Sequence, residues 1–104
     1  SKTIRERVLA ARRLQTERFS GTAIACNAEI PSSAMKQYCE LDEPALRLLA
    51  AASTKRQFSA RALDRITRVA RTIADLASCE EIAVEHVAEA IQYRSLERLD
   101  SRAA

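Results

Sequence analysis

The sequence contains few of the residues that break helices or close tight turns. Its 104 residues include one glycine and two prolines, Gly21, Pro31 and Pro44. A sheet built from several hairpins needs more turn residues than this. Tryptophan is absent and 4% of the residues are aromatic, whereas 47% are hydrophobic and many of these are alanine. Because alanine favours helix, the composition predicts an all-α fold.

The chain also lacks the long apolar runs that membrane insertion or secretion would require. No run approaches the roughly 18 apolar residues of a membrane-spanning helix. Residues 1–7, SKTIRER, contain no apolar stretch of the kind found in a secretory signal. We therefore expect a cytoplasmic protein with no membrane partner.

The length limits the number of domains. A chain of 104 residues can form one modest core and is too short for two. It has no initial methionine and begins directly in a helical pattern. We therefore predict that residues 1–104 form a single helical domain excised from a longer protein, although processing of a free-standing chain would leave a similar N-terminus.

Residues that commonly carry chemistry are scarce as well. Cys26, Cys39 and Cys79 are widely spaced and form no Cys-x-x-Cys motif, and the single histidine, His86, has no nearby cysteine. These spacings predict reduced thiols and no metal site. One glycine is too few for a P-loop, and no nucleophile adjoins His86. We therefore expect no enzymatic activity from the domain by itself.

Hydrophobic spacing predicts a small bundle of about five helices with short connections. The first spans about residues 3–19, and a short second helix has Ser32 or Ser33 as its N-cap. The third begins after Asp42, a good N-cap residue. The residues predicted to face inward are Ile4, Val8, Ala11 and Leu14 in the first helix and Leu46, Leu49, Ala50 and Ser53 in the third.

The fourth helix has the clearest start signal. Ser59 is its predicted N-cap, and Phe58 is placed to pack on Leu63 as a hydrophobic staple. The predicted inward row is Leu63, Ile66, Ala70, Ile73 and Ala77, widened by Ala62, Val69 and Leu76. The predicted exposed ion pairs on the opposite side are Asp64–Arg68 and Arg71–Asp75.

The last predicted helix follows a turn over residues 78–83 that includes a short extended piece at Ile82. Residues 96–104 show no helical periodicity. The residues predicted to face inward are Val84, Val87, Ala88 and Ile91.

Two features could contact phosphate. The first is the basic charge of the chain, which has a net charge of +3 and a pI near 9.0, with several arginines on the first helix. A solvated face is the commoner use of such residues.

The second feature is Arg61, which falls in the first turn of the fourth helix, beside unpaired N–H groups and the positive end of the helix dipole. Its planar guanidinium can contact two phosphate oxygens at once. A first-turn arginine is more often simply solvated, so both interpretations stay open for Arg61.

Three segments resemble the C-terminal domain of magnesium-chelatase-like AAA+ ATPases, and most of all the ComM/YifB branch. They are SARA at residues 59–62, ARTIADL at 70–76 and EHVAEAIQYR at 85–94. A weaker similarity extends to RVLAARRLQ at 7–15 and to Asn27-Ala28. The resemblance thus covers most of the chain and is least specific between residues 29 and 57.

The resemblance implies a helical lid that follows a P-loop ATPase core. The core, not the lid, would bind ATP and Mg²⁺. In that family the Ser-x-Arg at the start of a lid helix resembles the sensor 2 motif, whose arginine reaches the terminal phosphates and couples hydrolysis to lid movement. That role falls on Arg61. Arg65 and Arg68 lie on the same side of the helix and are candidates to assist, with structural pairing as their alternative use.

The resemblance also implies partners. Proteins of this branch are associated with natural transformation, where they are thought to drive branch migration on DNA as hexameric helicases. Partners would be the P-loop core of the same chain, neighbouring subunits of a ring, and DNA through the full-length protein. Three alternatives stay open: the lid of a true magnesium chelatase ATPase subunit, a stand-alone DNA-binding module that uses the basic first helix, and a protein-interaction domain in which Arg61 has no role.

Overall fold

The structure is a computed structural model that describes the backbone of residues 2–103 and the side chains of residues 2–95. Within that range it is all-α, as the composition predicts, and the five expected helices are present. No helix there combines the length and the apolar character needed to cross a bilayer. The helices are α1 (Lys2–Arg18), α2 (Met35–Tyr38), α3 (Glu43–Arg56), α4 (Ala60–Leu76) and α5 (Val84–Ala103), with the 3₁₀ turns η1 (Asn27–Glu29) and η2 (Ser32–Ala34) between α1 and α2.

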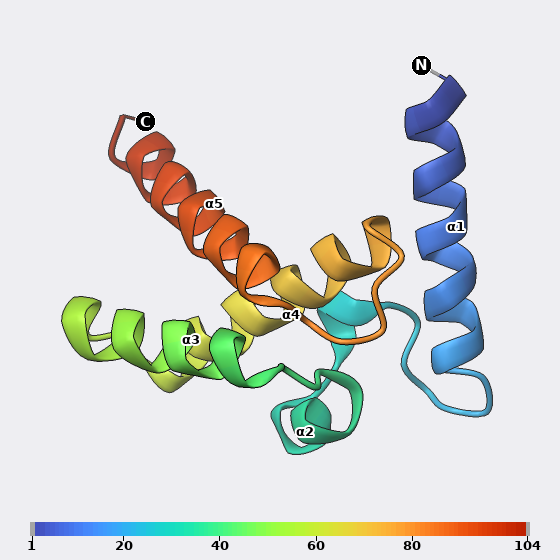
Figure 1. The fold of residues 1–104 in the computed structure, drawn as a ribbon, viewed down its shortest axis with the longest axis horizontal. Coiled ribbons are helices and arrows are strands. Elements are labelled where there is room, and N and C mark those ends of the chain that lie inside the picture. Colours follow the sequence, from blue (N-terminus) through green and yellow to red (C-terminus); the bar gives the residue numbers. More distant parts are fainter. Residues whose placement is uncertain (1, 104) are drawn as a thin grey trace.

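Helix α4 lies at the centre of the molecule. Figure 1 shows α3 and α5 beside one part of it and α1 near its C-terminal end, and α4 contacts α5, α1 and η1. Leu41 and Ile82 form an isolated parallel bridge, which confirms the extended piece predicted at Ile82. The buried core gathers residues from every part of the chain: Phe19, Ile30, Cys39, Ala45, Ile66, Ala70, Ala74, Ile82, Val87, Ala90 and Ile91.

Two of the predicted N-caps are confirmed. The Asp42 side chain accepts a hydrogen bond from the Ala45 N–H at 2.9 Å, and Ser59 Oγ accepts one from the Ala62 N–H at 3.1 Å. Such caps stabilise a helix by about 1 kcal/mol each. The predicted serine cap before α2 is wrong, because η2 precedes that helix and Ser32 Oγ instead contacts the Asp64 carboxylate.

The buried face of α4 agrees only in part with the prediction. Ala62, Ile66 and Ala70 are buried as predicted, and Ala74 is buried as well, whereas Ala77 is exposed because the helix ends at the preceding residue. The helix also buries a polar row, Thr67, Arg71 and Asp75. The apolar spacing alone could not reveal that this polar row is buried as well.

The outer helices show the same kind of difference. In α3, the residues that are buried or pack against the core are Ala45, Leu48, Leu49 and Ala52. The prediction was therefore right for Leu49. It was wrong for Leu46 and Ala50, which are exposed. In α1, Ala11 is buried, but Ile4 and Val8 are exposed, at 61% and 37%. In α5, Val87 and Ile91 are buried as predicted, whereas Val84 and Ala88, which were also predicted to face inward, are exposed. The helix continues through residues 96–103, although the sequence shows no helical periodicity there.

Candidate functional site

Arg61 lies in the first turn of α4 with its side chain exposed, as the sequence predicts. The Ser59 cap determines where the helix begins, and the Leu63 N–H donates to the Ser59 carbonyl at 3.0 Å. The N–H groups of Ala60 and Arg61 come before that bond, where helical N–H groups have no intrahelical acceptor and the dipole potential is positive. The first turn of α4 therefore combines an exposed arginine with N–H groups at the positive end of the helix dipole, a combination that can attract an anion.

The two neighbouring arginines differ in their surroundings. Arg65 is exposed, one turn further along α4. Arg68 is half-buried, and its Nε donates to the Ile30 carbonyl at 2.8 Å. The predicted Asp64–Arg68 ion pair does not form among the described residues, since Asp64 accepts from Ser32. Arg68 therefore has a structural contact to the loop after η1, and its assisting role remains a prediction.

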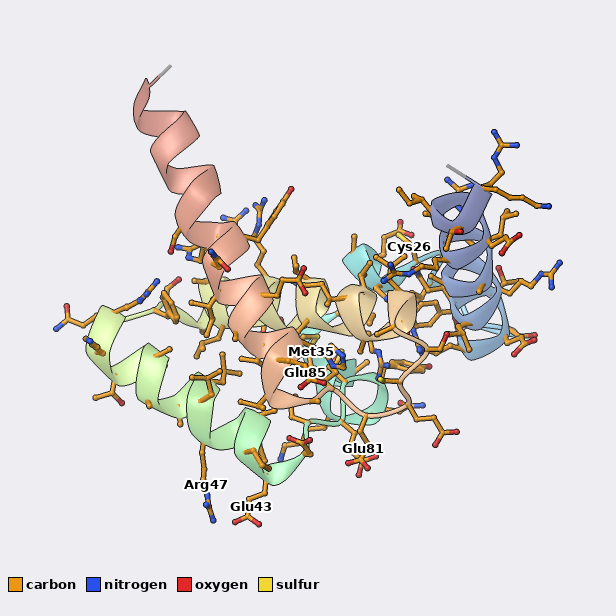
Figure 2. All side chains as sticks on the ribbon, turned by 45° about the horizontal axis from the view of Figure 1, so that its top comes forward. Cys26, Met35, Glu43, Arg47, Glu81 and Glu85 are labelled. Atoms are coloured by element: carbon orange, nitrogen blue, oxygen red, sulfur yellow. The ribbon has the colours of Figure 1, made fainter. Side chains whose placement is uncertain are left out.

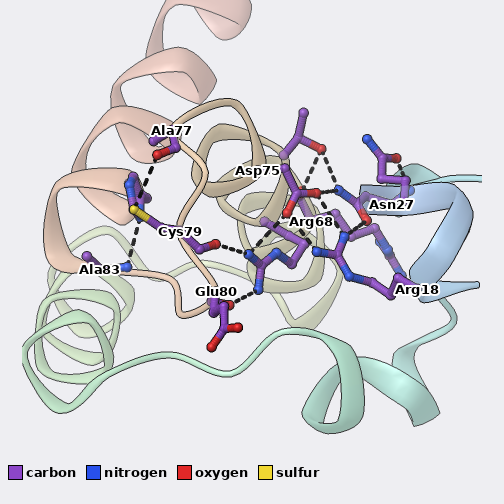
Figure 3. A network of polar contacts seen from close by, with 12 residues as sticks. Arg18, Asn27, Arg68, Asp75, Ala77, Cys79, Glu80 and Ala83 are labelled. Atoms are coloured by element: carbon purple, nitrogen blue, oxygen red, sulfur yellow. Dashed lines mark hydrogen bonds and ion pairs between the residues drawn. The ribbon is translucent and has the colours of Figure 1, made fainter. Parts of the chain in front are cut away.

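A buried polar network lies at the other end of α4 (Figure 3). Asp75 is fully buried and accepts two parallel hydrogen bonds from Arg18 of α1, at 2.7 and 2.8 Å. Asn27 of η1 donates to the same carboxylate at 2.8 Å and accepts from Arg18 at 2.9 Å. One carboxylate thus connects α1, η1 and α4.

The electrostatics of this network keep Asp75 ionised. Burial alone would raise the pKa of Asp75, but the hydrogen bonds from Arg18 and Asn27 and the positive charge of Arg71 outweigh burial and hold this pKa below its ordinary value. The hydrogen bond to Asp75 in turn raises the pKa of Arg18. Because both carboxylate oxygens accept hydrogen bonds from charged or amide donors, Asp75 is suited to joining helices and not to accepting a proton in catalysis.

Arg71 extends the network into the loop between α4 and α5. Its guanidinium donates to the carbonyls of Glu80 and Cys79, at 2.7 and 2.8 Å, and lies 3.1 Å from Asp75 (Figure 3). The predicted Arg71–Asp75 pair is therefore present, but the prediction that it is exposed is wrong, since the two side chains are 3% and 0% exposed. Its burial is offset by Arg18 and Asn27, which donate to the Asp75 carboxylate, and by the loop carbonyls that accept from the two terminal nitrogens of Arg71, while Arg71 Nε has no hydrogen-bond partner among the described residues.

Sequence reasoning missed the roles of Arg18 and Asn27. In the sequence, Asn27 belongs only to the weaker part of the family resemblance, and Arg18 is one of several arginines on the first helix. A usable signal was the polar pair Arg71–Asp75 beside the buried alanines Ala70 and Ala74, since a charged pair next to a tight helix contact is poorly placed for solvent. His86 is buried, and its Nδ1 accepts a hydrogen bond from the Ala83 N–H at 2.9 Å at the start of α5, which is a structural use of the residue.

These observations define a class of protein: an all-α domain whose buried charges join its helices and whose exposed helix end is suited to an anion. The chain matches the family described as "Magnesium chelatase, subunit ChlI C-terminal" over residues 1–94. It therefore belongs to that family of magnesium-chelatase-like C-terminal domains.

Relatives of known sequence place the chain more closely. It is 39% identical over 99 residues to the competence protein ComM of Haemophilus influenzae, and 35% identical over 99 residues to YifB of Escherichia coli, an uncharacterized protein. Each match covers 95% of this chain and 19% of the relative. The chain thus spans about a fifth of the length of these proteins.

Proposed function

We propose that this chain is the C-terminal lid of a magnesium-chelatase-like AAA+ ATPase, and that Arg61 contacts the terminal phosphates of ATP bound with Mg²⁺ by a P-loop core of the same protein. The observation that carries the proposal is the exposed Arg61 in the first turn of the capped helix α4, in a chain of this family. The two candidates to assist are Arg65, exposed one turn further on, and Arg68, whose Nε contacts the Ile30 carbonyl.

The geometry suggests how such a lid would act. A guanidinium at a helix end stabilises negative charge on a phosphate without reorganising during the reaction. Loss of the γ-phosphate after hydrolysis removes that attraction, so the position of α4 relative to the core changes with the bound nucleotide. The rest of the domain moves with α4, because Asp75 and Arg71 tie it to α1, η1 and the loop before α5.

The substitution Arg61→Ala in the whole protein tests the proposal. We expect the turnover of ATP to fall by about 10²-fold, because a charged contact to the transferring phosphate is lost. The free energy of unfolding should change by less than about 0.5 kcal/mol, since the side chain is exposed. Both quantities can be measured on the same preparation, by steady-state ATP hydrolysis and by urea titration.

The matched control is Arg47→Ala. Arg47 is also an exposed helical arginine, with a side chain 76% exposed that forms an ion pair with Glu43, and Figure 2 shows both side chains pointing away from the body. Its removal should leave turnover unchanged. Equal turnover in wild type and Arg61→Ala would rule out the sensing role.

For the whole protein, we propose a DNA-directed motor, a ring that drives branch migration during natural transformation. The relative ComM is a competence protein, which supports this role, whereas the family description favours the alternative of a magnesium chelatase subunit. ATP-dependent movement of a labelled four-way DNA junction by the whole protein would support the DNA-directed motor. Insertion of magnesium into protoporphyrin in the presence of the other chelatase subunits would support the magnesium chelatase subunit.

A stand-alone DNA-binding module is a further alternative, beside the protein-interaction domain in which Arg61 has no role. It requires that the 104-residue chain bind duplex DNA with an affinity that falls steeply with salt, as expected when lysines and arginines neutralise phosphates. Fluorescence anisotropy across a salt series distinguishes this case from the lid, for which we expect weak binding or none.

A further inference from the structure

The corner between α3 and α4 comes directly before Arg61, and α5 contacts this corner through its side chains. The Arg94 guanidinium carbon lies 5.7 Å from the centre of the Phe58 ring. Arg56 Nη1, at the end of α3, donates to Ser95 Oγ of α5 at 2.9 Å. Two consecutive residues of α5 therefore contact the two ends of a three-residue segment that leads into α4.

The contact between Arg94 and Phe58 has an energetic basis. Arg94 is half-buried, and its Nε is buried with no hydrogen-bond partner among the described residues. Burying a charged nitrogen without an acceptor is unfavourable. The face of an aromatic ring within about 6 Å offsets part of that penalty, and the attraction is stronger where water is excluded. The Phe58 ring thus offsets part of the cost of burying the Arg94 guanidinium.

The backbone of the corner transmits the position of Phe58 to Arg61. Gln57 has φ of 53°, a left-handed conformation that ends α3, and the Phe58 N–H donates to the Ser53 carbonyl at 3.3 Å. Ser59 follows as the N-cap, and Arg61 is the second residue of the helix. A residue that packs just before an N-cap sets the angle at which the chain enters the helix. Only Ser59 and Ala60 separate Phe58 from Arg61 along the chain, and Ala60 already belongs to the helix.

We infer that Arg94 is a positioning residue for Arg61: its guanidinium holds the Phe58 ring and so sets the direction of the first turn of α4. The inference rests on the proposed function and adds α5 to the elements that control the orientation of Arg61. A displacement of α5 would alter the orientation of Arg61 without any contact between α5 and nucleotide.

A double-mutant cycle in the whole protein tests the inference. Arg94→Met keeps the length and apolar packing of the side chain and removes its charge. We expect Arg94→Met to lower kcat for ATP by about two- to fivefold, the effect of losing one cation–π contact. In the Arg61→Ala background it should have no further effect, because the residue through which it acts is gone. A reduction of equal size in both backgrounds would overturn the positioning role.

Four further variants make the readout specific. Phe58→Leu, which keeps an apolar side chain without a ring face, should reproduce Arg94→Met, and Phe58→Tyr should resemble wild type. Arg94→Lys should restore part of the activity, because an ammonium is also attracted to the ring. Gln92→Met is the matched control, since Gln92 is exposed on α5 close to Arg94 in sequence, and it should leave kcat unchanged. Failure of Phe58→Leu to lower kcat would also contradict the inference.

A separate measurement distinguishes an error in the proposed sensing role of Arg61 from an error in the positioning role of Arg94. If Arg61→Ala leaves turnover unchanged, the sensing role is lost, and the positioning claim is then judged on amide NMR spectra of the 104-residue chain. Arg94→Met should shift the amide signals of residues 59–62 more strongly than Gln92→Met does. Equal and small shifts for both variants would refute the positioning claim itself.

Discussion

Ser78 occupies a backbone conformation that glycine adopts with less strain. Its φ is 58°, directly after α4 and its C-cap residue Ala77. The Cys79 N–H donates to the Ala74 carbonyl at 2.9 Å and the Ser78 N–H donates to the Asp75 carbonyl at 3.0 Å. This pair of hydrogen bonds is the Schellman pattern, in which the residue at the Ser78 position is usually glycine.

Ser78→Gly should therefore stabilise the chain. We expect the free energy of unfolding to rise by about 0.5–1 kcal/mol, because the left-handed conformation disfavours a residue that carries a Cβ atom. Urea unfolding followed by far-UV circular dichroism measures this change. Ala77→Gly is the control and should lower stability, since Ala77 has a φ of −91° and gains nothing from glycine. A loss of stability in Ser78→Gly would contradict the argument.

At the scale of the helix, α4 decides how the core is arranged. The ridge Ala62, Ile66, Ala70 and Ala74 repeats every four residues, and its alanines allow neighbouring elements to approach closely. Ile66 is 1% exposed, whereas Ile73, one turn before the end of the helix, is only half-buried. The two isoleucines should therefore contribute unequally to stability.

Ile66→Ala should lower the free energy of unfolding by about 3–4 kcal/mol, since a buried isoleucine leaves a cavity in a packed core. Ile73→Ala should cost less, about 1–2 kcal/mol, because its site is partly solvated and can relax. Denaturant titration of the two variants measures the difference. The reverse order would mean that the other side of α4 faces the core.

At the scale of the whole molecule, Asp75 joins parts of the chain that are far apart in sequence. Arg18 is 57 residues from it and Asn27 is 48 residues away. Since folding lowers the pKa of Asp75 below its ordinary value of 3.8, the folded state binds its proton less readily than the unfolded chain. The stabilisation by ionised Asp75 is therefore complete above about pH 4 and is lost as the pH falls from there through the folded-state pKa.

Asp75→Asn should remove this acid sensitivity and weaken the fold at neutral pH. We expect a loss of about 3–5 kcal/mol at pH 7, because Arg18 and Arg71 would stay buried without a counter-ion. Between pH 5 and pH 2 its free energy of unfolding should fall less steeply than that of wild type, as measured by urea titration at each pH. Parallel curves would show that other carboxylates cause the acid unfolding.

Several features of this protein follow from neighbouring residues alone. The starts of α3 and α4 were predicted correctly because an N-cap depends on a side chain and an N–H three residues later, as at Asp42 and Ser59. The position and exposure of Arg61 were predictable for the same reason, since they depend on where that cap lies. The segments around residues 59–62, 70–76 and 85–94 also identified the family, which the comparison confirms.

The tertiary structure decided which side of each helix is buried and which charges are desolvated. The spacing of Arg71 and Asp75 predicted an ion pair, but its burial depends on Arg18 of α1 and on carbonyls of a distant loop. Likewise, nothing near Phe58 in the sequence indicates that Arg94 lies over its ring. Capping is a local hydrogen bond within one turn, whereas burial of a charge is stable only when partners from elsewhere in the chain replace water, and those partners are brought together only by the fold.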